Sequence, residues 1–171
     1  MIGAPRFLLT LLAFTALLAP AAGAAPIASS TPSAGQAVVM RPLTLIKLAD
    51  LNFGDLTVTT GGASTISPVT GFATLTGGLV QVGGAPAPAR FRGTASRLSL
   101  VIVRSSTPTV LLRRSGGTET LTLNNLTVSG GALRVVGNTP FDFAIGGRLT
   151  VPAGTLDGVY SATFDITVEY F

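Results

Sequence analysis

The sequence predicts an all-β domain, a sandwich or a barrel, on three observations. From Ala37 onward, short runs rich in Val, Leu, Ile and Thr follow one another, and none carries the 3.6-residue apolar stripe of a helix. Several runs alternate apolar and polar residues, which is the period of a half-buried strand. Gly-Gly pairs recur along the chain, and glycine tolerates the positive φ of tight turns. The pairs, expected at turns, are Gly61-Gly62, Gly77-Gly78, Gly83-Gly84, Gly116-Gly117, Gly130-Gly131 and Gly146-Gly147.

The first 24 residues predict a secretory signal peptide. Arg6 supplies a positive charge, Phe7 to Leu18 is an apolar run, and Ala22 to Ala24 gives an A-x-A cleavage site. This run has 12 residues, whereas a membrane-spanning helix needs about 20. We therefore expect cleavage after Ala24, export of the mature chain, and no membrane span in it.

The mature chain of 147 residues is long enough for one domain with its own core. Residues 25–36 are small, polar and interrupted by proline, and we expect a flexible leader there. Residues 37–171 then form a single β domain. The expected strands are Ala37–Leu48, Leu51–Val58, Ser64–Ser67, Phe72–Val82, Ala89–Ala95, Leu98–Val103, Thr109–Arg113, Glu119–Ser129, Leu133–Val136, Phe141–Val151 and Tyr160–Phe171.

One internal strand carries a predicted irregularity. Leu121 and Leu123 alternate with polar residues and are expected to face inward. The phase slips near Asn124-Asn125, after which Leu126 takes the inward face. Such a slip is typical of a β-bulge.

The composition argues against an enzyme. The chain has no His and no Cys, which excludes His-based triads, thiol chemistry and most zinc sites. The carboxylates form no calcium-loop pattern, and the glycine pairs lack the Lys-Ser/Thr of a phosphate-binding loop. We therefore expect no catalytic residues, no metal and no cofactor. The carboxylates are Asp50, Asp55, Glu119, Asp142, Asp157, Asp165 and Glu169.

Nucleic-acid binding is not expected either. Without Arg6, ten basic residues stand against seven acidic ones and are spread along the chain. A nucleic-acid surface needs clustered Lys and Arg with interleaved aromatic residues. The high isoelectric point therefore reflects few charges of either sign.

The chain ends on its most regular alternation. Phe164, Ile166, Val168 and Tyr170 share one face of a predicted strand, while the residues between them are polar. An outer-membrane barrel would need the opposite register, with apolar residues at the positions that hold Glu169 and its polar neighbours, and one step of register moves every side chain to the other face. A membrane barrel is therefore rejected.

This ending resembles that of subunits of chaperone–usher pili. Their pattern has a glycine fourteenth from the end, apolar residues at the eighth, sixth and fourth places, and a penultimate aromatic. Gly158, Phe164, Ile166, Val168 and Tyr170 occupy those places here. The resemblance implies an immunoglobulin-like sandwich that lacks its last strand. It also implies partners, because a periplasmic chaperone and then a neighbouring subunit add a strand to the open edge.

Nearly the whole mature chain also resembles an exported bacterial family catalogued as a domain of unknown function (number four-four-zero-two), which is related to spore-coat-U and pilin families. The similarity lies in Pro42–Leu56, Gly146–Gly154 and the ending from Gly158. It implies a pilin-like, surface-associated sandwich and brings no catalytic residues.

The family motif Leu-x-Phe-Gly corresponds here to Leu51, Phe53 and Gly54. We expect Phe53 to be a core anchor where the first strand bends, and Gly54 to let the chain turn past it.

One feature departs from a self-polymerising pilin. A donor strand needs alternating bulky apolar residues, and the leader offers only Ile27. Either Ala37–Leu48 doubles as the donor, despite the interruption at Pro42, or the protein ends a fibre, or it does not polymerise.

Two hypotheses follow. The first is a structural subunit of a pilus or fimbria-like fibre, assembled by strand donation along its C-terminal edge and located in the periplasm and then on the cell surface. The alternative is a monomeric secreted or periplasmic module that binds carbohydrate or protein, in which the last strand completes a closed sandwich.

Overall fold

The computed structural model describes residues 37–137 and 140–171, and this part of the chain folds into eleven strands without a helix. The predicted signal peptide and leader lie outside the described residues. The strands are β1 (Thr44–Ala49), β2 (Asp55–Ile66), β3 (Ala73–Gly83), β4 (Ala89–Thr94), β5 (Ser99–Ser105), β6 (Thr109–Arg114), β7 (Thr120–Val128), β8 (Leu133–Val136), β9 (Phe141–Val151), β10 (Tyr160–Ser161) and β11 (Ile166–Tyr170).

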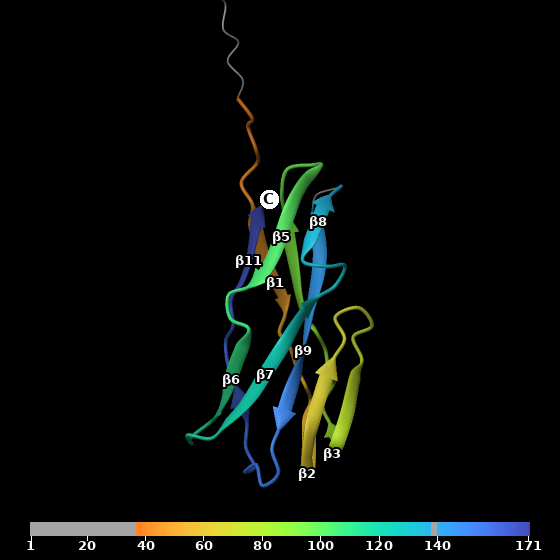
Figure 1. Ribbon diagram of the computed structural model, residues 1–171, viewed down its shortest axis with the longest axis vertical. Coiled ribbons are helices and arrows are strands. Elements are labelled where there is room, and N and C mark those ends of the chain that lie inside the picture. Colours follow the sequence, from red (N-terminus) through yellow and green to blue (C-terminus); the bar gives the residue numbers. More distant parts are fainter. Residues whose placement is uncertain (1–36, 138–139) are drawn as a thin grey trace, which may run out of the picture. The chain divides into compact units, whose positions relative to one another are not determined.

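The strands form two antiparallel sheets (Figure 1). The larger sheet runs β1-β4-β9-β7-β6-β10, and the smaller one runs β11-β5-β8. The long strand β9 is central to the larger sheet. Along one edge, its first half pairs with β4 and its second half pairs with β2, and its other edge pairs with β7. β3 pairs with β2 alone and extends this branch.

The core has two parts. Between the two sheets, Phe91 and Phe143 of the larger sheet stack with ring centroids 5.4 Å apart and pack with Val103 of the smaller sheet. Farther along β9, the larger sheet curls on itself, so that Ile66 from β2, Leu123 from β7 and other apolar residues form a second cluster. The domain is therefore an all-β sandwich, as predicted.

Two strand predictions, Leu133–Val136 and Phe141–Val151, are confirmed residue for residue as β8 and β9. The predicted bulge is confirmed as well. The pairing of β7 with β9 shifts register between Asn124 and Thr127, and Asn125 has φ 51°. Leu121 and Leu123 are buried on the inward face.

The prediction that glycine pairs mark turns is wrong for Gly61-Gly62 and Gly77-Gly78, and the kink or turn predicted at Gly146-Gly147 does not end β9. The pairs at 61–62, 77–78 and 146–147 lie inside β2, β3 and β9. A Cβ at Gly62 would collide with the Thr76 carbonyl oxygen, and one at Gly146 with that of Ile66. These glycines therefore permit close approach of neighbouring backbones rather than reversal of the chain.

The ends of the domain also differ from prediction. The first strand begins at Thr44 rather than Ala37, since the segment before Pro42 is exposed and makes no ladder. Leu51–Val58 and Ser64–Ser67 are not separate, because β2 runs from Asp55 to Ile66.

The last run, expected as one strand from Tyr160 to Phe171, is split. β10 bonds to β6 of the larger sheet, and β11 bonds to β5 of the smaller one. The chain crosses between sheets at residues 162–165, which explains the interruption.

Candidate strand-binding groove

The candidate site is the outer edge of β11. Ile166–Tyr170 pairs antiparallel with β5, from Ile166 opposite Ser105 to Tyr170 opposite Val101. Within residues 37–137 and 140–171, no strand pairs with the other edge of β11. The backbone N–H and C=O groups on that edge therefore lack ladder partners among the described strands, which is the condition that strand addition requires.

The side chains of this edge face the core but are not fully buried. Phe164, Ile166 and Val168 pack against the cluster between the sheets, and Tyr170 packs against the adjoining one. All four remain partly exposed, whereas Asp165, Thr167 and Glu169 between them are exposed. The alternation predicted from the sequence is thus present, with an incompletely buried apolar face.

The opposite wall comes from β1. This strand pairs only with β4, so it ends the larger sheet as β11 ends the smaller one. Leu43 and Leu45 are partly buried and pack against the same clusters as Val168. Two sheet margins with apolar inner faces therefore share one core without a strand between them in the part of the chain that the structure describes.

A hollow of about 420 Å³ continues this margin toward β10. We call it the groove hollow. Its lining includes Leu51 and Phe53 after β1, Leu123 of β7, and the crossing segment from Tyr160 to Phe164. Because Phe53 and Leu123 are core residues, the hollow reaches the interior of the domain.

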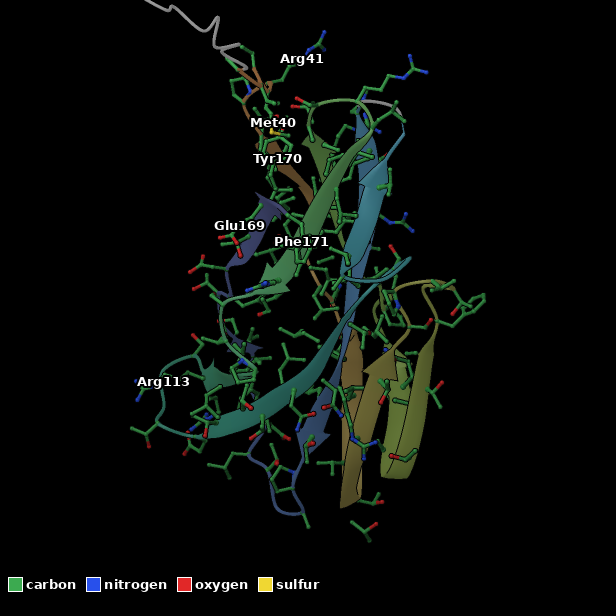
Figure 2. All side chains as sticks on the ribbon, turned by 45° about the horizontal axis from the view of Figure 1, so that its top comes forward. Met40, Arg41, Arg113, Glu169, Tyr170 and Phe171 are labelled. Atoms are coloured by element: carbon green, nitrogen blue, oxygen red, sulfur yellow. The ribbon has the colours of Figure 1, made fainter. Side chains whose placement is uncertain are left out.

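Tyr170 closes the margin at the other end. Its hydroxyl donates to the Arg41 carbonyl oxygen at 2.6 Å and accepts from the Ser96 backbone N–H at 2.8 Å. The Arg41 N–H in turn donates to the Ser96 hydroxyl at 2.7 Å. Figure 2 shows Met40, Arg41 and Tyr170 gathered at one end of the domain. Tyr170 therefore ties the last strand to the segment that enters β1.

Gly158 lies in the loop before β10 and away from the β11 edge. It has φ 151°, and a Cβ there would come within 3.0 Å of the Arg114 side chain. Glycine is required because the loop must pass this close to Arg114. The five residues of the ending thus split: Phe164, Ile166, Val168 and Tyr170 form one wall, while Gly158 positions the loop ahead of them.

Arg114 holds that loop. Its Nε lies 2.9 Å from the Glu119 carboxylate, and the Ser115 N–H donates to the Val159 carbonyl at 2.8 Å. The hydrogen bond from Arg114 holds the pKa of the Glu119 carboxyl below its ordinary value, and the same bond raises the pKa of Arg114. This ion pair is structural support at the start of the C-terminal run.

The predicted anchor Phe53 lies in the core, with Leu51 packed between both main clusters. Asn52 exchanges two backbone hydrogen bonds with Ala87 at 2.9 and 2.8 Å, and its side-chain oxygen accepts from the Gly54 N–H at 2.9 Å. Gly54 has φ 72°. The roles predicted for Phe53 and Gly54, an anchor and a turn, match this geometry.

Sequence reasoning missed the second wall and its closure. The sequence shows the alternation of Leu43 and Leu45, but the predicted strand Ala37–Leu48 starts too early and does not indicate that these leucines face β11. Nothing in the sequence linked Arg41 and Ser96 to Tyr170, because these residues are far apart in the chain. Their contact depends on how the two sheets stack.

Within the described ranges, no three or more His, Cys, Asp or Glu residues form a group that could hold a metal ion. No helix in this part of the chain is long and apolar enough to cross a membrane.

The fold and the groove define an all-β sandwich with an unpaired C-terminal strand edge in its described part. A family model described as "Domain of unknown function (DUF4402)" matches residues 43–170. The chain belongs to this family. No curated protein and no solved structure matches it.

Proposed function

We propose that this protein is a structural subunit of a bacterial surface fibre, assembled by β-strand donation along β11. The single observation that carries the proposal is the outer edge of β11, where a backbone without a ladder partner among the described strands adjoins the partly exposed side chains of Ile166 and Val168. A donated strand would supply the missing ladder and bury those side chains together.

The proposal includes a route. The chain is exported, meets a periplasmic chaperone that lends a strand to the β11 edge, and then exchanges it for a strand from a neighbouring subunit at the cell surface. No catalytic step, metal or cofactor is part of this role.

The pairing of β1 argues against one candidate for the donor strand. Thr44–Ala49 pairs with β4 and contributes Leu45 to the core, so β1 is already engaged in its own subunit. Of the segment Ala37–Leu48, only residues 37–43 lie outside this ladder. Donation by β1 itself is therefore not proposed.

Adding a donor peptide to the mature chain tests the proposal. The peptide should alternate bulky apolar and polar residues over about ten positions. Burial of four or five apolar side chains gives a gross gain on the order of 10 kcal/mol, less the cost of ordering the peptide. We expect a higher Tm and slower hydrogen exchange of the β11 amides, measured by mass spectrometry.

The matched control is a peptide with the same composition but with its alternation scrambled, which should change neither quantity. A mature chain that already melts cooperatively as a monomer, with β11 amides protected and no response to the peptide, would contradict strand donation and favour the monomeric binding module.

A further inference from the structure

The two ends of the sandwich differ in chemistry. The β4–β5 loop, residues 95–98, follows β4, and the β9–β10 loop, residues 152–159, follows β9. Because β4 pairs antiparallel with the first half of β9, these loops lie at opposite ends, separated by roughly the 35 Å that an 11-residue strand spans. Figure 1 shows the β8 arrowhead at the first end and the β9 arrowhead at the other.

The β4–β5 loop presents a leucine that folding does not explain. Leu98 has φ 59°, a conformation that is unfavourable for a bulky side chain, and it is 73% exposed. Its N–H donates to the Val136 carbonyl at 2.7 Å, which fixes the loop in place. Gly or Asn would relieve the strain, and an exposed leucine gains no burial within the chain. Backbone strain of this kind is concentrated at functional sites, which makes Leu98 a candidate contact residue.

This end is also basic. Arg97 precedes Leu98, and Arg41 is held beside the loop by its bond to Ser96. Neither arginine takes part in an ion pair among the described residues. The acidic residue nearest in sequence to Tyr170, which anchors this end, is Glu169. Its side chain lies on the outer face of β11. We call Arg41, Arg97 and Leu98 the tip.

The opposite end has a complementary recess of about 580 Å³, which we call the base cavity. Its floor includes the buried side chains of Phe53 and Leu149. Its rim carries exposed apolar residues, Leu156 at 51% and Val159 at 72%.

The rim of the base cavity is acidic. Asp55 and Asp157 line it, and neither belongs to an ion pair in the described part of the chain. Arg114 stands near this rim but is paired with Glu119, and its neighbour Arg113 in β6 is exposed. A recess with apolar residues on its floor and two carboxylates on its rim thus lies at the opposite end of the domain from a basic tip with an exposed leucine.

We infer that the tip of one copy docks into the base cavity of the next, with Leu98 entering the recess and Arg97 and Arg41 facing Asp157 and Asp55. The contact joins two different surfaces and is therefore head-to-tail, a geometry that continues into linear assemblies rather than closing as a dimer. Neither surface contains a residue of β11, so the contact is distinct from strand donation. The two sites are neighbours, because Arg41 accepts a hydrogen bond from Tyr170 and the base cavity shares Leu51, Phe53, Leu112 and Tyr160 with the groove hollow.

Cysteine cross-linking tests the contact without background, because the chain has no cysteine. One mature variant carries Leu98→Cys and another carries Val159→Cys. We expect disulfide-linked dimers when the two are mixed and none from either variant alone. A mixture of Leu98→Cys with Val80→Cys, an exposed valine on β3, is the matched control and should stay monomeric. Cross-linking of Leu98→Cys to itself, or equal yields in both mixtures, would overturn the inference.

A charge swap gives the second test. Arg97→Glu should weaken association of the mature chain about tenfold in sedimentation experiments, and adding Asp157→Arg to the same chain, so that every contact carries the swapped pair, should restore it. Leu98→Gly should raise the Tm, since the strain is relieved, yet reduce association. Unchanged association in Arg97→Glu and Leu98→Gly would refute the contact, whatever the outcome of the donor-peptide experiment.

Discussion

β5 and β11 are neighbours in the same small sheet, and each places a valine against the same cluster, yet the two valines differ sharply in burial. Val103 of β5 and Val168 of β11 are register partners that face the same cluster. Val103 is 1% exposed, whereas Val168 is only partly buried. β5 has β11 on one side and β8 on the other, while β11 has β5 alone among the described strands.

The difference shows that side-chain burial in this sandwich depends on the flanking strand as much as on residue type. A valine with two neighbouring strands is sealed from water, and a valine at a margin is not. Part of this contrast is visible in the sequence, since residues 100–103 of β5 are continuously apolar whereas β11 alternates apolar and polar residues. The sequence does not show that β11 lies at a margin. The contrast in burial is also the physical basis for placing a partner at β11.

Truncating both valines tests this difference in burial most directly. Val103→Ala removes fully buried methyl groups and should cost about 2–3 kcal/mol of unfolding free energy. Val168→Ala should cost about 1 kcal/mol or less in the isolated chain, because part of the side chain is already in water. Equilibrium urea denaturation of the mature chain measures both. Equal losses would mean that β11 is as covered as β5.

Removing the Tyr170 hydroxyl tests how the end of β11 beside Arg41 and Ser96 is held. Tyr170→Phe deletes the bonds to Arg41 and Ser96 and should cost about 1–2 kcal/mol, since two polar backbone groups lose a partner. Faster hydrogen exchange should appear at the Ser96 amide. Tyr160→Phe, whose hydroxyl donates to the Leu156 carbonyl at 2.8 Å, is the control and should leave Ser96 unaffected. An unchanged exchange rate in Tyr170→Phe would show that this end is held by packing alone.

A smaller effect on stability is expected at the start of the C-terminal run, where the Arg114–Glu119 ion pair supports β10. The pKa of Glu119 is lowered from its ordinary value of 4.5 in the folded chain, so the pair stabilises the fold above that pH. The contribution is lost as the pH falls through the lowered value. Thermal melts between about pH 6 and pH 3 should fall less steeply for Glu119→Gln than for the unaltered chain. Identical slopes would remove the ion pair from the account of how β10 is held.

Much of the fold could be predicted from local pattern. β8, β9 and the bulge at Asn125 were expected because alternation and its interruptions are written in consecutive residues. The glycine pairs were less informative. Gly62 and Gly146 serve close packing between strands, and a pair of this kind looks the same in sequence as a turn.

Only one of the two walls of the groove could be predicted from the sequence. Phe164, Ile166, Val168 and Tyr170 share a face because of the two-residue period of a strand. The wall formed by Leu43 and Leu45 could not be predicted, since it depends on which margin of the other sheet faces β11.

The sequence by itself determined that this chain is built of strands, which side chains of each strand point inward, and that its last strand is amphipathic. These are consequences of short-range periodicity and backbone sterics. Only the tertiary structure decided that the final run divides between two sheets, that Tyr170 reaches the entrance to β1, and that β11 lies at a margin. Those features depend on strand pairing between residues far apart in the chain, where burial and hydrogen bonding of the whole domain, rather than any local preference, select the arrangement.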